Sequence, residues 1–429
     1  MKFVSTRGGG EPVSLSEAIL NGVAPDGGLY LPETIPAADL SQLTPDLSLA
    51  DFATRLLAPF FTGDRLESEL AAICGEAYDF DVPLFDAVRG LKSLELFHGP
   101  TGAFKDFGAR FLMGCFDRLG DKARPLTVLA ATSGDTGGAV GRAAEGLEKV
   151  RAVILYPKGR VSAFQELQLT CWAAPVAAIE VDGDFDDCQR LVKIAFADAA
   201  LVDQHRLSSA NSINICRWLP QMAYHAQAAV RIFAETGVNP GLIIPAGNLG
   251  HGFAALYARA MGLPIGPIML PTNANRTLST WAETGDYVPM PSVATIANAM
   301  DVGSPSNFER LISLDPALRE VSVERVEDDA IRARIKADFA AGYLWCPHSA
   351  TGAEAYARMS PEQQAERPWV VAATAHPYKF ADVIEPLIGE PVEPSPPLRA
   401  ILGREARKSS IAATPEALAT ELEALRALV

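Results

Sequence analysis

The chain has 429 residues, of which 37 are Lys or Arg and 52 are Asp or Glu, giving a formal net charge of −15. A surface this acidic argues against nucleic acid and anionic membranes as partners. The length predicts two or three domains, and no apolar run is long enough to span a bilayer. The N-terminus lacks the apolar stretch of a secretory signal, which favours the cytoplasm.

The cysteines and histidines give no sign of a disulfide framework or a metal site. The six cysteines are scattered without a Cys-x-x-Cys pair, and the six histidines form no His-Glu-x-x-His motif. We therefore expect buried, reduced thiols and no metal.

The first ninety residues predict a mainly helical N-terminal region, residues 1–90. A turn-rich stretch at 24–32 precedes helical spacing of apolar residues at 48–61 and at 64–78.

From residue 126 the pattern alternates between strands and helices, which predicts parallel sheets covered on both faces. Strands are expected at 126–131, 151–156, 176–181, 241–245, 265–270 and 369–373. Helices are expected at 107–119, after the first strand as far as residue 146, at 161–171, at 184–200, from 215 onward and at 250–261. Residues 390–397 are too rich in proline for regular structure and predict a linker. A last helix is expected to begin at Pro415 with Thr414 as its N-cap.

Lys105 is the first candidate for chemistry. It stands where turn residues lead into an apolar helix, between Phe104 and Phe107. In an apolar pocket its pKa would fall, and a neutral amine is what a Schiff-base nucleophile requires. The alternative is a surface lysine at a helix start, and the local pattern leaves both interpretations open.

Two glycine-rich turns each join a predicted strand to a predicted helix, at 130–139 and at 244–252. Helix N-termini in such turns present free N–H groups to an anion. Neither turn has the Gly-Lys-Ser/Thr ending of a Walker loop or the Gly-x-Gly-x-x-Gly fingerprint, and a structural glycine turn is the alternative. His251 either meets a phosphate or lies on the surface.

Two further segments carry polar side chains. Residues 208–214 are small and polar and precede a helix that contains Arg217. They either cap this helix or form a phosphate site with the arginine. Thr374, at the end of the strand predicted at 369–373, is placed to meet a ligand.

Together these segments resemble the threonine synthases, a family of fold type II pyridoxal-phosphate enzymes related to the tryptophan synthase β-subunit. The resemblance runs nearly the full length of the chain. It is carried by residues 26–32 (Asp-Gly-Gly-Leu-Tyr-Leu-Pro), 95–101, 104–108 (Phe-Lys-Asp-Phe-Gly), 131–137 (Ala-Thr-Ser-Gly-Asp-Thr-Gly), 154–157, 182–186, 209–214 (Ser-Ala-Asn-Ser-Ile-Asn), 299–302 and 374–377 (Thr-Ala-His-Pro).

The resemblance implies two mostly parallel-sheet α/β domains behind the helical N-terminal region. A large cofactor-binding domain would comprise residues 91–125 and 205–388. A small domain, residues 126–204, would be inserted into it, and 389–429 would be a C-terminal linker and helix. Related enzymes are monomers or homodimers, and the sequence leaves both open.

The resemblance also implies roles for single residues. Lys105 matches the Schiff-base lysine, and Thr374 the residue that hydrogen-bonds the pyridine nitrogen of pyridoxal 5′-phosphate. The remaining implied contacts are Gly247, Asn248, Leu249 and Gly250 for the cofactor phosphate, Asp135 near the ring's 3′-oxygen, and Asn211, Ser212, Arg217 and Ser133 for the substrate phosphate. In the cofactor loop, Ala246, Leu249 and His251 replace the family's more usual Ser, Phe and Asp, which preserves backbone donors but changes side-chain contacts.

The implied reaction is the last step of threonine biosynthesis, from O-phospho-L-homoserine and water to L-threonine and phosphate, catalysed by a lyase. A serine or threonine dehydratase would share the fold but need no second phosphate site, so Asn211, Ser212 and Arg217 discriminate against it. A binding protein without activity is the other alternative, and Lys105 in its intact context speaks against it.

Overall fold

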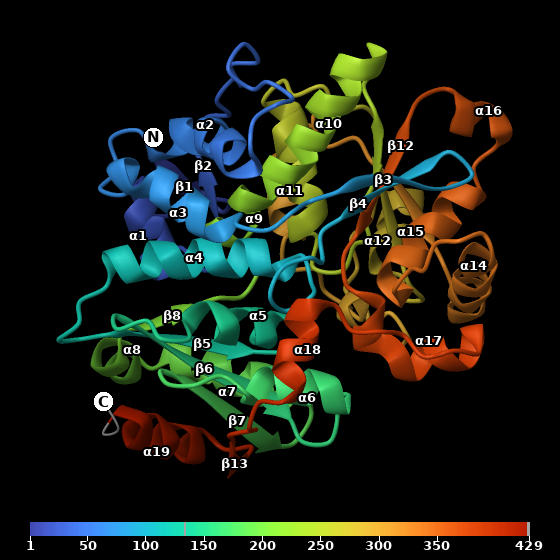
Figure 1. Cartoon of the computed structure of the whole chain (residues 1–429). Coiled ribbons are helices and arrows are strands. Elements are labelled where there is room, and N and C mark those ends of the chain that lie inside the picture. Colours follow the sequence, from blue (N-terminus) through green and yellow to red (C-terminus); the bar gives the residue numbers. More distant parts are fainter. Residues whose placement is uncertain (133, 427–429) are drawn as a thin grey trace.

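Two mostly parallel sheets with helices on both faces form the body of the molecule (Figure 1). The computed structural model describes residues 1–132 and 134–426. The larger sheet has the order β11-β10-β9-β12-β4-β3, and only its edge strand β3 is antiparallel to its neighbour. Its strands are β3 (Leu84–Val88), β4 (Leu91–Glu95), β9 (Gly241–Ile243), β10 (Ile268–Thr272), β11 (Ser322–Arg325) and β12 (Trp369–Ala373).

Alternate side chains of the large sheet enter two different cores. Leu242 and Val370 face one core, and their neighbours Ile243 and Val371 face the other. The first core is shared with α4 (Lys105–Leu119), α9 (Ile215–Trp218), α10 (Met222–Thr236) and α11 (Gly250–Ala260), and the second with α14 (Asp328–Ala340), α15 (Pro347–Ala357) and α17 (Ala381–Ile388). Both faces are apolar because both are covered, as expected for parallel strands.

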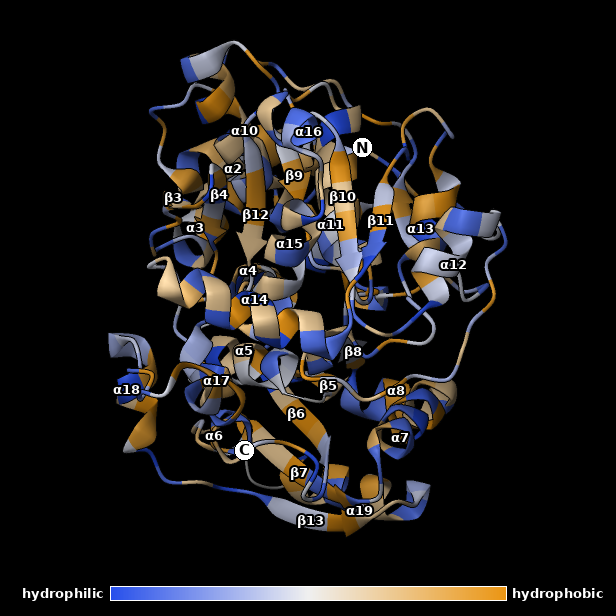
Figure 2. Ribbon diagram, turned by 90° about the vertical axis from the view of Figure 1, so that its right-hand side faces the viewer, coloured by the Kyte–Doolittle hydropathy of each residue, from blue (hydrophilic) through white to orange (hydrophobic). Residues whose placement is uncertain are grey.

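The smaller sheet is parallel throughout and has the order β13-β7-β6-β5-β8. Its strands are β5 (Leu126–Ala131), β6 (Val150–Pro157), β7 (Val176–Asp182), β8 (Leu207–Ser209) and β13 (Ser409–Ala412). Leu129 and Val153 face α7 (Phe185–Ala197) and α19 (Pro415–Arg426). Ile154 on the other face packs against α6 (Ala163–Thr170), next to α5 (Asp135–Ala144). Figure 2 shows the central strands of both sheets as mostly hydrophobic.

The N-terminal region packs on α4 through its helices. It contains β1 (Phe3–Ser5), α1 (Leu15–Asn21), β2 (Tyr30–Pro32), α2 (Leu49–Phe61), η1 (Glu67–Glu69) and α3 (Leu70–Ala77). Ser48 accepts a hydrogen bond from the Asp51 amide and fixes the start of α2, which confirms the helix predicted at 48–61. The helix predicted at 64–78 is shorter, because a separate 3₁₀ turn precedes it.

Short helices complete the fold around the sheets. They are α12 (Thr277–Thr284), η3 (Asn298–Met300), α13 (Phe308–Ser313), α16 (Pro361–Ala365), η4 (Pro377–Phe380) and α18 (Pro396–Leu402). Within the described residues, no helix is both long and apolar enough to cross a membrane, and no cluster of His, Cys, Asp and Glu side chains could hold a metal ion.

Three further predicted elements differ in the structure. The single helix predicted at 184–200 is two, α7 and α8 (Ala199–His205), because the Asp198 side chain accepts hydrogen bonds from the amides of Ala200 and Leu201 and starts a new helix. The long helix after Ile215 is interrupted by the 3₁₀ turn η2 (Leu219–Gln221), which contains a proline. The linker predicted at 390–397 ends earlier, because α18 begins at Pro396.

The small sheet also extends beyond the predicted small domain, 126–204. Strand β8 lies after its end, and β13 and α19, predicted as a C-terminal linker and helix, complete the same sheet. Strand β3, predicted within the N-terminal region 1–90, pairs with the large sheet instead. These strands are too short for an alternation of apolar and polar residues to reveal them in the sequence. The division of the chain into a large domain and an inserted small domain stays a proposal.

Candidate active site

A cavity of about 790 Å³ lies where the carboxyl ends of strands from both sheets meet. This is the usual position of a ligand site in parallel α/β proteins. All the predicted site residues that the structure describes line this cavity: Lys105, Asp135, Asn211, Ser212, Arg217, Gly247, Asn248, Leu249, Gly250 and Thr374. Ser133 lies outside the described residues.

Lys105 reaches the cavity because its segment is paired to the segment that follows β12. The Phe104 amide donates to the Thr374 carbonyl at 2.9 Å, and the His376 amide donates to the Gly102 carbonyl at 2.9 Å. Lys105 is the next residue and the first of α4. The backbone pairing therefore fixes Lys105 and Thr374 as neighbours at one end of the cavity.

Asp106 locks the turn that precedes Lys105. Its carboxylate accepts hydrogen bonds from the hydroxyl of Thr101 at 2.7 Å and from the amide of Thr101 at 2.9 Å. A Cβ on Gly99 would lie 2.5 Å from Asp106 Oδ2, so no larger residue fits there without movement. Lys105 thus projects from a rigid helix start.

The Lys105 amine is held among few polar groups. Its side chain is 17% exposed, and Nζ lies 3.9 Å from Asp135 Oδ2 and 4.9 Å from the centre of the Phe104 ring. Burial lowers the pKa of Lys105; Asp135 opposes this effect, whereas the positive charges of Arg217 and Lys379 add to it. The site therefore favours the neutral, nucleophilic form of the amine.

Asp135 begins α5 and lies between two lysines. Besides Lys105, it contacts Lys379, whose Nζ is 3.1 Å from Asp135 Oδ1. Burial alone would raise the pKa of Asp135, but Lys379, Lys105 and other nearby groups outweigh it and lower the pKa to about 2. Asp135 is therefore a carboxylate at neutral pH.

The turn at 247–250 gives α11 an open N-terminus. Leu249 adopts a left-handed backbone conformation, with φ of 64°, which is unfavourable for a residue other than glycine. A Cβ on Gly247 would lie 3.0 Å from the Ala299 carbonyl oxygen. The Phe253 amide makes the first helical bond, to the Leu249 carbonyl, so the N–H groups of the first turn are free for an anion.

His251 lines the cavity, and its interpretation as a surface residue is wrong. It is 6% exposed and its ring stacks on Phe104, with centroids 4.3 Å apart. Neither ring nitrogen has a hydrogen-bond partner among the described residues. Burial, together with His225 and Lys105, lowers the pKa of His251 well below its usual value, so it is a neutral ring beside the Lys105 segment.

His225, which lies beside His251, should make folding stability depend on pH. Burial lowers the pKa of His225 to about 3. The unfolded chain therefore binds one more proton than the folded chain between about pH 3 and 6.5, and stability rises with pH across this window. We expect His225→Phe to flatten this rise by about 1.4 kcal/mol per pH unit. Urea unfolding between pH 4 and 6 measures it, and an unchanged slope would contradict the assignment.

Arg217, in α9, lines the same cavity and lies against α4 at Gly108. It is 4% exposed, and one of its terminal nitrogens donates to the Ala210 carbonyl. Its Nε has no partner, and it forms no ion pair with a carboxylate in the described chain. Burial lowers the pKa of Arg217 to about 10, so the side chain remains a cation at neutral pH.

The polar segment before α9 divides its tasks between capping and the cavity. Asn214 caps the helix, since its side-chain oxygen accepts a hydrogen bond from the Cys216 amide at 3.1 Å. Asn211 and Ser212 instead line the cavity near Arg217. The capping interpretation is therefore confirmed for Asn214, and the phosphate site of Asn211 and Ser212 stays a prediction.

Gly108 allows α4 to lie directly against Arg217. A Cβ at this position would be 2.8 Å from the Arg217 carbonyl oxygen and 3.1 Å from its Nε. We expect Gly108→Ala to displace Arg217. The free energy of unfolding should fall by about 1–3 kcal/mol, and the KM for the phosphorylated substrate should rise. The control is Gly75→Ala in α3, where an added Cβ meets nothing within 4 Å. Thermal unfolding and steady-state kinetics check both variants; equal effects would contradict the prediction.

The sequence did not single out several residues near the site. His348 and Asn298 line the cavity, and Lys379 lies behind Asp135. Lys379 follows shortly after the predicted Thr374 segment, which was the one available signal. The Thr132 hydroxyl oxygen accepts hydrogen bonds from the amides of Gly134 and Gly137 and shapes the turn before α5.

Comparison with known proteins agrees with this geometry. Residues 92–375 match the family model of pyridoxal-phosphate dependent enzymes, residues 2–78 match the threonine synthase N terminus, and residues 349–421 match the threonine synthase C-terminal model. Over 383 residues the chain is 37% identical to the threonine synthase of Haemophilus influenzae, an alignment that covers 88% of this chain and 89% of that relative. The chain belongs to the threonine synthase family.

Two solved structures of this family have the same fold. The threonine synthase of Escherichia coli superposes with a TM-score of 0.91 at 32% identity, covering 99% of this chain and all of that one. The threonine synthase of Brucella melitensis with bound pyridoxal phosphate gives a TM-score of 0.91 at 33% identity, with 99% of both chains covered. The predicted fold class is thereby confirmed. This member of the threonine synthase family is a pyridoxal-phosphate-dependent lyase of fold type II.

The residues of the cavity fit pyridoxal 5′-phosphate. A half-buried lysine with a lowered pKa is present for the aldehyde, and an open helix N-terminus for the phosphate. Because Gly247 has no side chain, the space beside its backbone stays open for the cofactor phosphate.

Proposed function

We propose that this chain converts O-phospho-L-homoserine and water to L-threonine and phosphate. The observation that best supports this reaction is a buried arginine without an acidic partner among the described residues, in the same cavity as Lys105. A buried cation is costly unless it is paired, so Arg217 is complementary to an anion that arrives with the substrate. A dehydratase of unphosphorylated amino acids has no use for such a group.

The contacts to the cofactor are proposed from the same geometry. The turn from Gly247 to Gly250, together with the start of α11, would hold the cofactor phosphate through its N–H groups. The Thr374 hydroxyl would meet the ring nitrogen, and Asp135 would face the ring oxygen next to Lys105. A neutral hydroxyl as the partner leaves the protonation of the ring nitrogen unforced.

Lys105 would carry the proton transfers. The bound cofactor supplies an electron sink that acidifies the carbon atoms next to the amino group. Lys105 has a lowered pKa and is the amine nearest to this position, so it can take the α-proton and return it at the end. Acid–base catalysis of this kind contributes about 10²–10⁴ in rate for each transfer.

The substrate phosphate would be bound by Arg217, Asn211 and Ser212. These groups lie on the segment that joins β8 to α9, whereas Lys105 begins α4 and Thr374 follows β12. An amino acid with a γ-phosphate would then bind with its amino end at Lys105 and its phosphate at Arg217. The local cations offset the net charge of −15 that would otherwise repel the substrate.

The wider organisation is also a proposal. The small sheet and its helices would form a domain that closes on the large one and excludes water during the reaction. A cytoplasmic location and a monomer or homodimer stay predictions from the sequence.

The decisive experiment follows two products at once. Purified, cofactor-loaded protein is incubated with O-phospho-L-homoserine, and phosphate and L-threonine are measured together. We expect equal amounts of both. Phosphate accompanied by 2-oxobutyrate and ammonia would show a lyase in which water releases the amino group and does not add at the β-carbon, and would refute the proposed reaction.

A further inference from the structure

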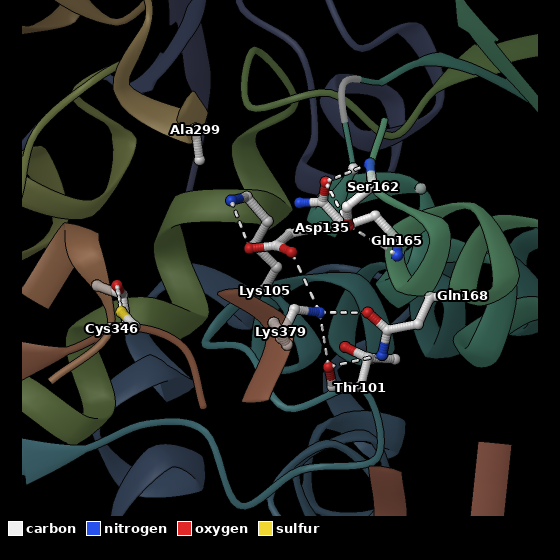
Figure 3. A network of polar contacts seen from close by, with 12 residues as sticks. Thr101, Lys105, Asp135, Ser162, Gln165, Gln168, Ala299, Cys346 and Lys379 are labelled. Carbon is white, nitrogen blue, oxygen red and sulfur yellow. Dashed lines mark hydrogen bonds and ion pairs between the residues drawn. The ribbon is translucent and has the colours of Figure 1, made fainter. Parts of the chain in front are cut away.

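Lys379 is a fully buried lysine outside the cavity. It lies in η4, and its side chain has no exposed surface. Its Nζ donates to the Thr101 carbonyl at 2.8 Å and to Gln168 Oε1, and it lies 3.1 Å from Asp135 Oδ1 (Figure 3). Two hydrogen bonds and one ion pair therefore surround the buried Lys379 ammonium group.

The three acceptors come from both parts of the molecule. Thr101 lies on the large-sheet side, before α4, whereas Asp135 and Gln168 lie in α5 and α6 over the small sheet. Gln168 also donates to the Thr101 carbonyl, at 2.9 Å. Any separation of the two parts would strip the Lys379 ammonium of two acceptors while leaving it in an apolar setting, which is unfavourable.

We propose that Lys379 is a positioning residue, which holds the Asp135 carboxylate beside Lys105 and ties the small sheet to the large one. The proposal rests on the proposed roles of Lys105 and Asp135 in the reaction. Lys379 influences Lys105 indirectly. Figure 3 shows Asp135 between the two lysines, so Lys379 acts on Lys105 through this carboxylate.

The charges around Lys105 indicate how the effect would be seen. The groups that influence it are Asp135 from α5, Arg217 from α9, Lys379 from η4 and Cys346 before α15, with His251 and His348 nearby. Among these, Lys379 and Arg217 lower the pKa of Lys105, and Asp135 raises it. Loss of the Lys379 charge removes one lowering influence and leaves Asp135 paired with Lys105 alone, so the pKa of Lys105 should rise.

The first test is a double-mutant cycle with Lys379→Met and Asp135→Asn, assayed by threonine formation in the cofactor-loaded enzyme. We expect Lys379→Met to lower kcat on the order of 100-fold, the cost of a misplaced catalytic contact, and to move the acidic limb of the pH profile to higher pH. In the Asp135→Asn background the same substitution should change kcat less than about threefold, because the group through which it acts is absent. Equal factors in both backgrounds would overturn the proposal.

Two further variants separate charge from packing. Lys379→Gln is a second neutral replacement, and it should move the pH limb as Lys379→Met does, so the test survives if the methionine variant does not fold. Lys379→Arg keeps the charge and should leave the limb where the unmodified enzyme has it. A limb that moves equally in Lys379→Gln and Lys379→Arg would overturn the proposal.

The tie between the sheets has a readout that needs no substrate. Amide hydrogen exchange in peptides from α5 and α6 should become faster in Lys379→Gln than in the unmodified, cofactor-loaded protein. The matched control is Lys408→Gln, which removes contacts to Glu166 in α6 and Glu180 in β7 without approaching Asp135. Equal exchange in both variants would overturn the tie. Because this measurement does not depend on threonine formation, it can fail independently of the proposed reaction.

Discussion

Lys105→Ala should abolish threonine formation, with a loss of at least about 10⁴-fold in kcat. The substitution removes the amine that binds the cofactor covalently and that takes and returns protons, and a single acid–base transfer is already worth about 10²–10⁴. The protein should still fold, because Lys105 is the first residue of α4 and the turn before it is locked by Thr101 and Asp106. Phosphate release and threonine formation measure the loss.

The covalent role gives this variant a second signature. The cofactor should be retained by the unmodified protein after gel filtration and lost from Lys105→Ala, because only contacts to its phosphate and ring remain. Lys122→Ala is the control, an exposed lysine that pairs with Glu148. A loss of less than about 100-fold would be smaller than the contribution of one acid–base transfer. If Lys105→Ala lost no more activity than this and also retained the cofactor, Lys105 would not be the catalytic amine.

Arg217→Leu should lower kcat/KM for O-phospho-L-homoserine roughly 30- to 4,000-fold, which corresponds to the loss of about 2–5 kcal/mol for a buried charged contact. The same substitution should keep or raise the melting temperature. Arg217 is buried without an acidic partner in the described chain, and replacing it with an apolar residue removes the cost of its desolvation. Opposite effects on activity and stability are the signature of a group that is present for its ligand.

Arg217→Lys refines this expectation. A lysine keeps the charge but cannot make a bidentate contact with phosphate, so its kcat/KM should lie between those of the unmodified enzyme and Arg217→Leu. The visible absorbance of the bound cofactor should stay unchanged in both variants, since Arg217 is assigned to the substrate. A fall in melting temperature together with loss of the cofactor would instead make Arg217 a structural residue.

The sequence predicted the strongly patterned parts of the fold. The strand at 126–131 and the strand at 369–373 were located to the residue, because each is an uninterrupted apolar run that is buried on both faces. Strands β8 and β13 were missed. Each has only three or four residues, most of them polar or small, and each pairs with a longer neighbouring strand that supplies its hydrogen bonds.

Within the site, residues at the ends of predicted strands were found and those behind them were not. Thr374 and Gly247 follow apolar runs, so their positions could be derived from the rule that ligands bind at carboxyl ends of parallel strands. Lys379 has no such signal, because a lysine between Tyr378 and Phe380 in the sequence looks the same whether it is solvated or buried. Its environment is created by Asp135 and Gln168, which only the folded chain brings to it.

The chain passes between the two sheets at three places: between α4 and β5, between β8 and α9, and between α17 and α18. A body joined to another by one tether can rotate in every direction, and one joined by two can still turn about the line between them. A third connection that lies away from that line leaves only the small movements that the flexibility of the connecting segments allows. We therefore expect the small sheet to shift by short, guided excursions. Even such a short movement would be enough to break the contacts that Lys379 and Gln168 make between the two sheets.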